Sequence, residues 1–227
     1  MENKFFVSDA DIALIKGRLG AVMAQDIHQD GEAYSIRSLY FDDMWDRCMD
    51  ENEAGVDNRR KFRIRTYDIH APQMNLEIKE KLRGYTKKTS SAITAEECTE
   101  IMNGTYNHIY DDRKTLNSLA VEMKTSLMRP KIIVDYERTA FVCPSGNVRI
   151  TFDRNIAATR CWQDFLCDDM SQLTPLLPAG MHIMEVKYDQ FIPDFITQLL
   201  ETGNLRQTAF SKYYLGRLAV NGDYTIR

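Results

Sequence analysis

The sequence predicts an α+β protein built on an antiparallel β-sheet or β-barrel, with helices around it. About eight stretches of the chain have strand character, and several of them alternate between apolar and polar residues with the period of two that a half-buried strand shows. Helical segments with capping signals stand between groups of these stretches. The chain has 227 residues, and we expect one domain over residues 1–227.

The first half of the chain opens with a strand and a capped helix. Residues 2–7 predict the strand, and Ser8 begins the helix, with Asp11 three residues later as an acidic capping box. Ile12, Ile15 and Leu19 then recur at helical spacing. The polar stretch 42–58 predicts a loop. The further strands expected in this half are 33–41, 59–67, 75–81 and 87–93.

The second half predicts more helices and a long hairpin. Thr94 and Glu97 form a helix start, and Asn103–Gly104 ends that helix. A second helix is expected over 111–127. A hairpin joins strands 132–143 and 147–155, and another strand covers 181–188. Two helices are expected near the C-terminus, over 195–201 and 207–220.

Composition narrows the range of functions. The net charge of −4 and the isoelectric point near 5.6 argue against a general nucleic-acid binder, which usually has a basic excess. The five cysteines form no CxxC pair, so we expect no zinc site and a reducing compartment. The sequence shows no signal peptide and no stretch of about 20 apolar residues that could span a membrane. We therefore expect a cytoplasmic protein.

The polar faces of the expected strands carry an unusual set of charges. Side chains two residues apart share a face of a strand. The residues that share such faces are Glu2 and Lys4; Lys61, Arg63 and Arg65; Glu77, Lys79 and Lys81; Tyr136 and Arg138; Arg149, Thr151 and Asp153; Glu185 and Lys187. For any one strand, a solvated outer face explains this pattern. Taken together, so many Lys and Arg on adjoining strands would repel one another unless an anion compensates them. Several phosphates in a row fit this set, since Arg grips phosphate with a planar fork.

Three carboxylates interrupt these basic faces. Glu2, Glu77 and Glu185 each precede a Lys by two residues on the same strand face. Each carboxylate either neutralises that Lys or holds a divalent metal beside the phosphates, because Mg²⁺ and Mn²⁺ favour carboxylate and phosphate oxygens together. The sequence alone leaves both readings open for Glu2 and Glu77, and we favour the metal for Glu185.

Nine fragments of the chain resemble, in their order, a known family. They are ENKFF, SLYFD, RRKFRIRTY, LEIKEK, GYTKK, DYERTAF, NVRITFD, MEVKY and FSKYYLG. This series resembles the VTC domain, the catalytic module of vacuolar transporter chaperone polyphosphate polymerases and of their bacterial relatives. That family belongs to the triphosphate tunnel metalloenzymes, also called CYTH-like proteins. The resemblance runs from Glu2 to about Gly216 and implies an eight-stranded antiparallel β-barrel that forms a tunnel, with surrounding helices.

The resemblance also implies roles for particular residues. Those expected to bind phosphate in the tunnel are Lys4, Arg63, Arg65, Lys79, Lys88, Tyr136, Arg138, Arg149, Lys187, Ser211 and Lys212. Glu185 is the expected ligand of Mn²⁺ or Mg²⁺, while Glu2 and Glu77 could bind metal or activate a water molecule. The four histidines lie outside the matching fragments and are expected to be structural or surface residues.

Three functions follow from this reading. The first is a polyphosphate polymerase that transfers the terminal phosphate of ATP to a growing inorganic polyphosphate chain. The second is a hydrolase of tripolyphosphate or nucleoside triphosphates, and the third is a non-catalytic polyphosphate-binding module. The expected partners are therefore ATP and inorganic polyphosphate or triphosphate, and not nucleic acid. A membrane-protein partner, which would bring the protein to a membrane, is an expectation from family analogy.

Overall fold

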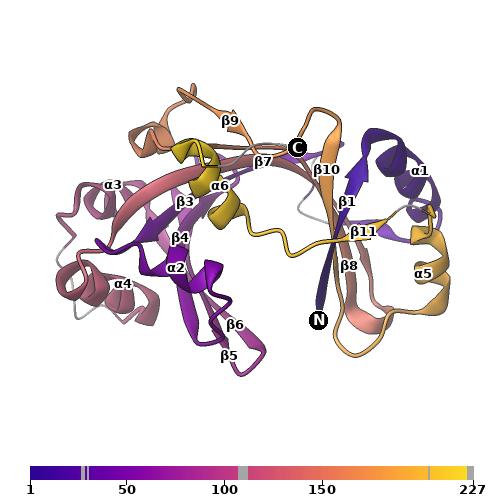
Figure 1. Ribbon diagram of the computed structural model, residues 1–227, viewed down its shortest axis with the longest axis horizontal. Coiled ribbons are helices and arrows are strands. Elements are labelled where there is room, and N and C mark those ends of the chain that lie inside the picture. The colour runs from indigo at the N-terminus through magenta and orange to yellow at the C-terminus, as the bar shows by residue number, and fades with distance from the viewer. Residues whose placement is uncertain (27–28, 30, 107–111, 204, 224–227) are drawn as a thin grey trace.

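Eight long antiparallel strands form one curved sheet in the computed structural model, which describes residues 1–26, 29, 31–106, 112–203 and 205–223 (Figure 1). In spatial order these strands are β1 (Glu2–Ser8), β10 (Met181–Lys187), β8 (Val148–Thr159), β7 (Arg129–Cys143), β3 (Tyr34–Asp42), β4 (Arg59–Thr66), β5 (Gln73–Leu82) and β6 (Tyr85–Thr94). Three two-residue strands join them: β2 (Ala24–Gln25) pairs with β7, β9 (Thr174–Pro175) with β8, and β11 (Arg206–Gln207) with β1. The α+β class and the eight main strands are as the sequence predicts.

The sheet does not close into the expected eight-stranded barrel. Within the described residues, no backbone pairing joins the edge strands β1 and β6. The free edge of β1 is instead taken by β11 and the residues after it, since Thr208 N–H donates to Lys4 O (2.9 Å) and Lys4 Nζ donates to Phe210 O (2.8 Å). The sheet is nevertheless curved enough for Glu2 on β1 to meet Lys79 on β5, with 3.8 Å between Oε2 and Nζ. This ion pair joins the edge strand β1 to β5, the strand next to the opposite edge, through side chains and not through backbone pairing.

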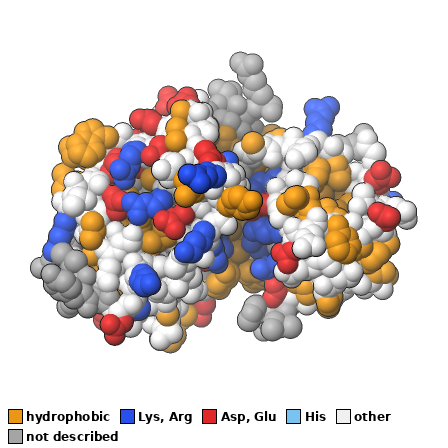
Figure 2. Space-filling model, turned by 90° about the horizontal axis from the view of Figure 1, so that it is seen from below, with side chains coloured by type: hydrophobic (Ala, Val, Ile, Leu, Met, Phe, Trp, Pro, Cys, Tyr) orange, Lys and Arg blue, Asp and Glu red, His pale blue; other side chains and the backbone are white. Residues whose placement is uncertain are grey.

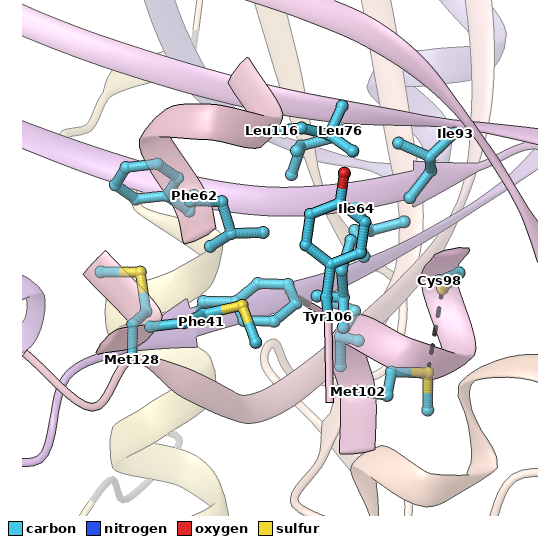
Figure 3. Close-up of a cluster of buried hydrophobic side chains, with 14 of the residues drawn as sticks. Phe41, Phe62, Ile64, Leu76, Ile93, Cys98, Met102, Tyr106, Leu116 and Met128 are labelled. Atoms are coloured by element: carbon cyan, nitrogen blue, oxygen red, sulfur yellow. Dashed lines mark hydrogen bonds between the residues drawn. The ribbon is translucent and has the colours of Figure 1, made fainter. Parts of the chain in front are cut away.

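Two groups of helices cover the outer face of the sheet at its opposite ends (Figure 1). Helices α3 (Ala95–Asn103) and α4 (Lys114–Thr125) pack on β3 to β6, where Phe41, Phe62 and Leu76 are buried (Figure 3). Helices α1 (Asp9–Leu19) and α5 (Asp194–Leu200) pack on β1, β8 and β10. Each fully buried Phe or Leu contributes about 1.5–3 kcal/mol, so these two clusters stabilise the two ends of the sheet.

A third hydrophobic cluster lies on the inner face, which we define as the face that carries Arg63, Arg138 and Glu185. Helix α6 (Lys212–Asn221) covers part of this face, and its Tyr213 packs there with Tyr136 of β7. Helix α6 approaches the sheet closely at Gly216, where an added Cβ would lie 2.8 Å from Ile132 Cδ1 and 3.2 Å from Ala158 Cβ. Glycine at this position therefore lets α6 sit directly on β7 and β8.

Most predicted elements are confirmed, with three differences. Helix α2 (Arg47–Glu53) occupies part of the stretch predicted as a loop, because the buried carboxylate of Asp42 accepts from Cys48 N–H (2.8 Å) and Met49 N–H (3.1 Å) and so holds its first turn. Helix α6 begins at Lys212 rather than at residue 207, because Ser211 caps it. Strand β7 begins at Arg129, before the predicted residue 132. The start predicted at residue 111 for the helix that became α4 lies outside the described residues. No described helix is long and apolar enough to cross a membrane.

Replacing Gly216 with Ala should destabilise the protein by about 1–3 kcal/mol, because the new methyl group overpacks the contact of α6 with β7 and β8. Gly17→Ala is the matched control. Gly17 lies in the last turn of α1 with no atom within 4 Å of an added Cβ, so alanine should stabilise that helix by up to about 0.5–1 kcal/mol. Urea unfolding of both variants measures the two changes. Equal stabilisation by both substitutions would contradict the close packing of α6.

Candidate functional site

The inner face carries more cations than carboxylates, and Figure 2 shows Lys and Arg side chains gathered in the hollow between the two halves of the molecule. The cations are Lys4, Lys61, Arg63, Arg65, Lys79, Lys88, Arg138, Arg149, Lys187 and Lys212. The carboxylates in ion pairs with them are Glu2, Asp26, Glu77, Asp153 and Glu185. The surplus is about five positive charges, although the whole chain carries −4. Such a focused field favours a polyanion.

The deepest part of this face is a cluster of two carboxylates and two cations. Asp153, which is 0% exposed, accepts two hydrogen bonds from Arg138, from Nε (2.6 Å) and Nη2 (2.7 Å). Lys212 Nζ, at the first turn of α6, donates to Glu185 Oε1 (3.0 Å) and also contacts Asp153. Arg138 and Lys212 both lie over the ring of Tyr136, at 5.4 and 4.8 Å from its centroid. The strands β7, β8 and β10 and the helix α6 thus each contribute one member to the cluster.

Glu185 stays ionised in this cluster despite its burial. Desolvation by itself would raise the pKa of Glu185, but the charges of Lys212, Lys4, Arg138 and Lys187 hold that pKa well below its usual range. The distances agree: its oxygens lie 3.4 Å from Lys4 Nζ, 3.4 Å from Arg138 Nη2 and 3.6 Å from Lys187 Nζ. An ionised carboxylate surrounded by cationic side chains has the chemistry to bind a divalent metal that arrives with phosphates.

A second charged group lies on β4, β5 and β6. Glu77 accepts from Arg63 Nε (2.7 Å) and Lys88 Nζ (3.0 Å), while Arg63 Nη1 donates to Tyr40 Oη (3.0 Å). Burial alone would raise the pKa of Glu77, but Arg63, Arg65 and Lys88 outweigh it and lower the pKa to about 2. Glu77 is therefore a weak base near neutral pH.

Arg65 and Lys61 of β4 have no carboxylate within 4.0 Å in the described part of the chain and are not bonded to backbone carbonyls. Arg65 is only 8% exposed, and its contacts are the hydroxyls of Ser38 (3.4 Å) and Tyr136 (3.3 Å). Lys61 Nζ donates to Asn52 Oδ1 and to Ser211 Oγ (3.2 Å). Arg65 is buried and Lys61 is half-buried, and a cation withdrawn from water without a counter-ion is costly. These two side chains therefore point to an anionic ligand.

A family model described as VTC domain matches residues 1–221, almost the whole chain. This chain belongs to the VTC domain family. The resemblance seen in the sequence fragments is thereby confirmed.

Solved structures are similar to this VTC domain in fold. One is a Bacillus halodurans protein whose proposed activity is adenylate cyclase, with 12% identity, a TM-score of 0.52 and coverage of 87% of this chain and 83% of that one. Another is a protein from Pyrococcus horikoshii OT3, with 13% identity, a TM-score of 0.50 and coverage of 98% and 96%. No curated protein matches the chain. At these identities the likenesses show the fold alone.

The structure of this VTC domain brings all the sequence-predicted site residues to the inner face or its rim. Arg63, Arg65, Arg138, Tyr136, Lys212 and Glu185 lie in the middle; Lys4, Lys79, Lys88, Lys187, Glu2 and Glu77 lie around them. Arg149 is at one end, where it meets Asp26 (2.8 Å) and the hydroxyl of Tyr34 (3.3 Å). Ser211 caps α6 by accepting from Tyr214 N–H (3.4 Å) and reaches Lys61 rather than the central cluster.

Some residues of the site were not assigned a role from the sequence. Asp153 shares the strand face of Arg149, but nothing in the pattern showed that it would be a fully buried counter-ion. Lys61 shares a strand face with Arg63, so the alternation in the sequence was enough to place Lys61 in the site. Asp26, by contrast, comes from outside the basic strand faces, and only the fold brings it to Arg149.

The described carboxylates of the inner face suit a metal held by one carboxylate and by phosphates better than a metal held by a protein cage. No three His, Cys, Asp or Glu side chains of the described residues converge in a group that could hold a metal ion. Mg²⁺ is commonly bound by one or two carboxylates together with substrate phosphates. Glu185 fits this requirement better than Asp153 does. It is ionised, it faces the cations that would hold the phosphates, and its Oε2 accepts only a long bond from Arg138 (3.4 Å), whereas Arg138 holds both oxygens of Asp153 at 2.6 and 2.7 Å.

The affinity for tripolyphosphate should decrease as the pH rises through about 8. Burial lowers the pKa of Lys61 to about 8, so its positive charge is present below that pH and lost above it. Burial opposes ionisation of Tyr40 as well, but Arg63 and Arg65 outweigh it and lower its pKa to about 8, so an added negative charge acts in the same direction. A charged hydrogen bond is worth about 1.5–3 kcal/mol.

Calorimetric titrations of the wild type and Lys61→Arg across this pH range test the prediction. Arginine keeps its charge, so the variant should lose less affinity than the wild type above pH 8, and the ionisation of the ligand is the same for both. Parallel pH profiles would show that Lys61 does not face the anion.

Proposed function

We propose that this VTC domain binds ATP and inorganic polyphosphate along its inner face and, with Mn²⁺ or Mg²⁺, transfers the terminal phosphate of ATP to the growing chain. The observation that carries the proposal is Arg65, a cation that is 8% exposed and has no carboxylate within 4.0 Å in the part of the chain that is described. Folding does not bury such a charge without cost. A row of phosphates would supply its partner, and Arg63 and Lys61 extend the same row along β4.

The cations would bind and orient the two phosphate-bearing substrates. Phosphoryl transfer needs little covalent help from a protein, because it depends on in-line alignment and on neutralising charge. Arg138 and Lys212 would exchange part of their contact with Glu185 and Asp153 for phosphate oxygens. Lys4, Lys187 and Lys79, which approach Glu2 and Glu185 at 3.4–3.9 Å, would do the same at the rim. The Tyr136 ring keeps Arg138 and Lys212 in position.

The transfer itself balances without a redox partner. A terminal oxygen of the polyphosphate chain forms a bond to the γ-phosphorus of ATP, and the bond from that phosphorus to the β,γ-bridging oxygen breaks. ADP leaves, and the chain is longer by one phosphate. The divalent metal, which Glu185 would hold, supplies charge neutralisation at the phosphate oxygens. Arg and Lys side chains stabilise the remaining charge in a site shaped before the substrates arrive.

The carboxylates favour transfer to phosphate over transfer to water. A hydrolase would need a base to activate water, and Glu77 and Glu2 are the candidates on this face. The pKa of Glu77 is about 2, and although burial acts to raise the pKa of Glu2, Lys187, Lys79 and Lys4 lower it. Both carboxylates are therefore poor bases near neutral pH. A phosphate chain needs no such base, since its terminal oxygens are already nucleophilic.

A product assay tests the proposal. The purified protein is incubated with ATP and Mn²⁺, polyphosphate is visualised on a gel, and free phosphate is measured in parallel. A ladder of chains is the expected result. Release of free phosphate without a ladder would make the protein a hydrolase, and absence of both products with retained polyphosphate binding would make it a binding module.

Arg65→Ala should weaken tripolyphosphate binding by about 1.5–3 kcal/mol, the value of a charged hydrogen bond. Arg60→Ala is the matched control, because Arg60 lies on the same strand but on the outer face, where it pairs with Glu122. Its affinity for tripolyphosphate should equal that of the wild type in a calorimetric titration. If Arg65→Ala also binds normally, Arg65 does not contact the ligand.

Glu185→Gln should abolish metal-dependent turnover while leaving polyphosphate binding largely in place, since the amide keeps the shape of the side chain but not its charge. Glu122→Gln is the control, because Glu122 is also a buried carboxylate but lies on the outer face, so this change should leave the metal dependence unchanged. Turnover is measured over a range of Mn²⁺ concentrations. Full activity of Glu185→Gln would refute its role as metal ligand.

A further inference from the structure

Two tyrosines lie at one end of the row of cations on β4. Arg63 and Arg65 share a face of that strand, and Tyr67 follows it two residues after Arg65. The Tyr67 ring packs against that of Tyr34, the first residue of β3, with centroids 5.9 Å apart and planes tilted by 55°. Tyr67 is 50% exposed, so much of its ring is open for a ligand to stack on.

Tyr34 connects this pair to the cations. Its hydroxyl accepts from Arg149 Nη2 (3.3 Å), and it is the register partner of Arg138 in the pairing of β3 with β7. Tyr34 is also packed against the hydrophobic cluster of the inner face, so its ring is held in place. Tyr67, by contrast, belongs to none of the three hydrophobic clusters formed by the described residues. Its packing on Tyr34 leaves much of the ring open to solvent.

We propose that Tyr67, supported by Tyr34, is the subsite that binds the nucleobase of the donor nucleotide. This inference rests on the proposed function, in which ATP is the donor. Residues two apart on an extended chain are about 7 Å apart, a span comparable to the ribose that separates a base from its α-phosphate. A nucleotide whose phosphates lie against Arg65 and Arg138 would therefore bring its base to the tyrosines. Stacking on an aromatic ring suits any base, because each has a π-face.

The subsite gives the reaction a direction along the inner face. With the base at Tyr67, the phosphates of ATP run from Arg65 toward Glu185 and Lys212. The acceptor chain then approaches from the opposite side, where Lys61, Lys79 and Lys88 lie. Donor and acceptor thus meet at the central cluster, and neither has to pass the other.

The test compares ATP with tripolyphosphate, which has the phosphates but no base. Tyr67→Ala should weaken ATP binding about 5- to 150-fold, the range expected for loss of one base–aromatic stack, and leave the tripolyphosphate affinity unchanged within about twofold. Tyr67→Trp should restore ATP binding, and its fluorescence should respond to ATP but not to tripolyphosphate. Tyr85→Ala, which removes a tyrosine that is 83% exposed at the tip of the β5–β6 hairpin, should change neither affinity.

Three results would overturn the subsite. If the Tyr67→Ala variant binds ATP with wild-type affinity, Tyr67 does not contact the nucleotide. Equal losses for ATP and tripolyphosphate would mean that Tyr67 only supports the fold of the phosphate site. Wild-type protein that binds tripolyphosphate but not ATP would refute both the nucleobase subsite and ATP as the donor, while leaving the phosphate site of the inner face intact.

Discussion

The positive charge held on the inner face of the curved sheet is the constraint on which the rest of this structure depends. Like charges on adjoining strands destabilise a sheet, and burial increases their cost. The protein offsets part of that cost with carboxylates placed between the cations, of which Asp153 and Glu185 are the most buried. The hydrophobic clusters on the outer face stabilise the strands against the repulsion that remains. The positive charge that no carboxylate offsets is centred on Arg65 and Lys61. An anion bound beside these two side chains would therefore be stabilised most.

Helix α6 links the C-terminal part of the chain to this charge arrangement. Gly216 allows the helix to lie directly on β7 and β8, and Lys212 at its start reaches both Asp153 and Glu185. The segment before the helix runs beside β1 and binds the backbone and side chain of Lys4. Without this C-terminal part of the chain the inner face would lack both Lys212 and the segment that covers the open edge of the sheet at β1. This explains how an open sheet can still enclose a charged site.

Much of the fold was predictable because local patterns and tertiary structure agree. Alternation along the strands assigned Arg63 and Glu185 to the face on which they lie, and the capping boxes at Ser8 and Thr94 marked true helix starts. Helix α2 was missed because its start depends on Asp42, a carboxylate buried by the tertiary fold and not a local cap.

The parts of the site that could not be predicted depend on long-range geometry. Strand tilt and the segments that cover the edge strands decide whether the two edge strands hydrogen-bond to each other. The sequences of β1 and β6 do not show whether this pairing forms. Asp153 is buried by residues of other strands, among them its register partner Arg138 on β7. The contact of Tyr34 with Tyr67 likewise joins two segments that are distant in the sequence. The sequence therefore predicted which charges share a face but not which of them lack a counter-ion.

Thermal unfolding with and without tripolyphosphate tests the central claim most directly. A ligand that binds only the folded state at about 100 times its dissociation constant stabilises a protein by about 2.7 kcal/mol. If the inner face holds uncompensated positive charge, tripolyphosphate should raise the melting temperature by several degrees, and chloride at matched ionic strength should not. An equal effect of the two salts, or no effect of tripolyphosphate, would contradict the account.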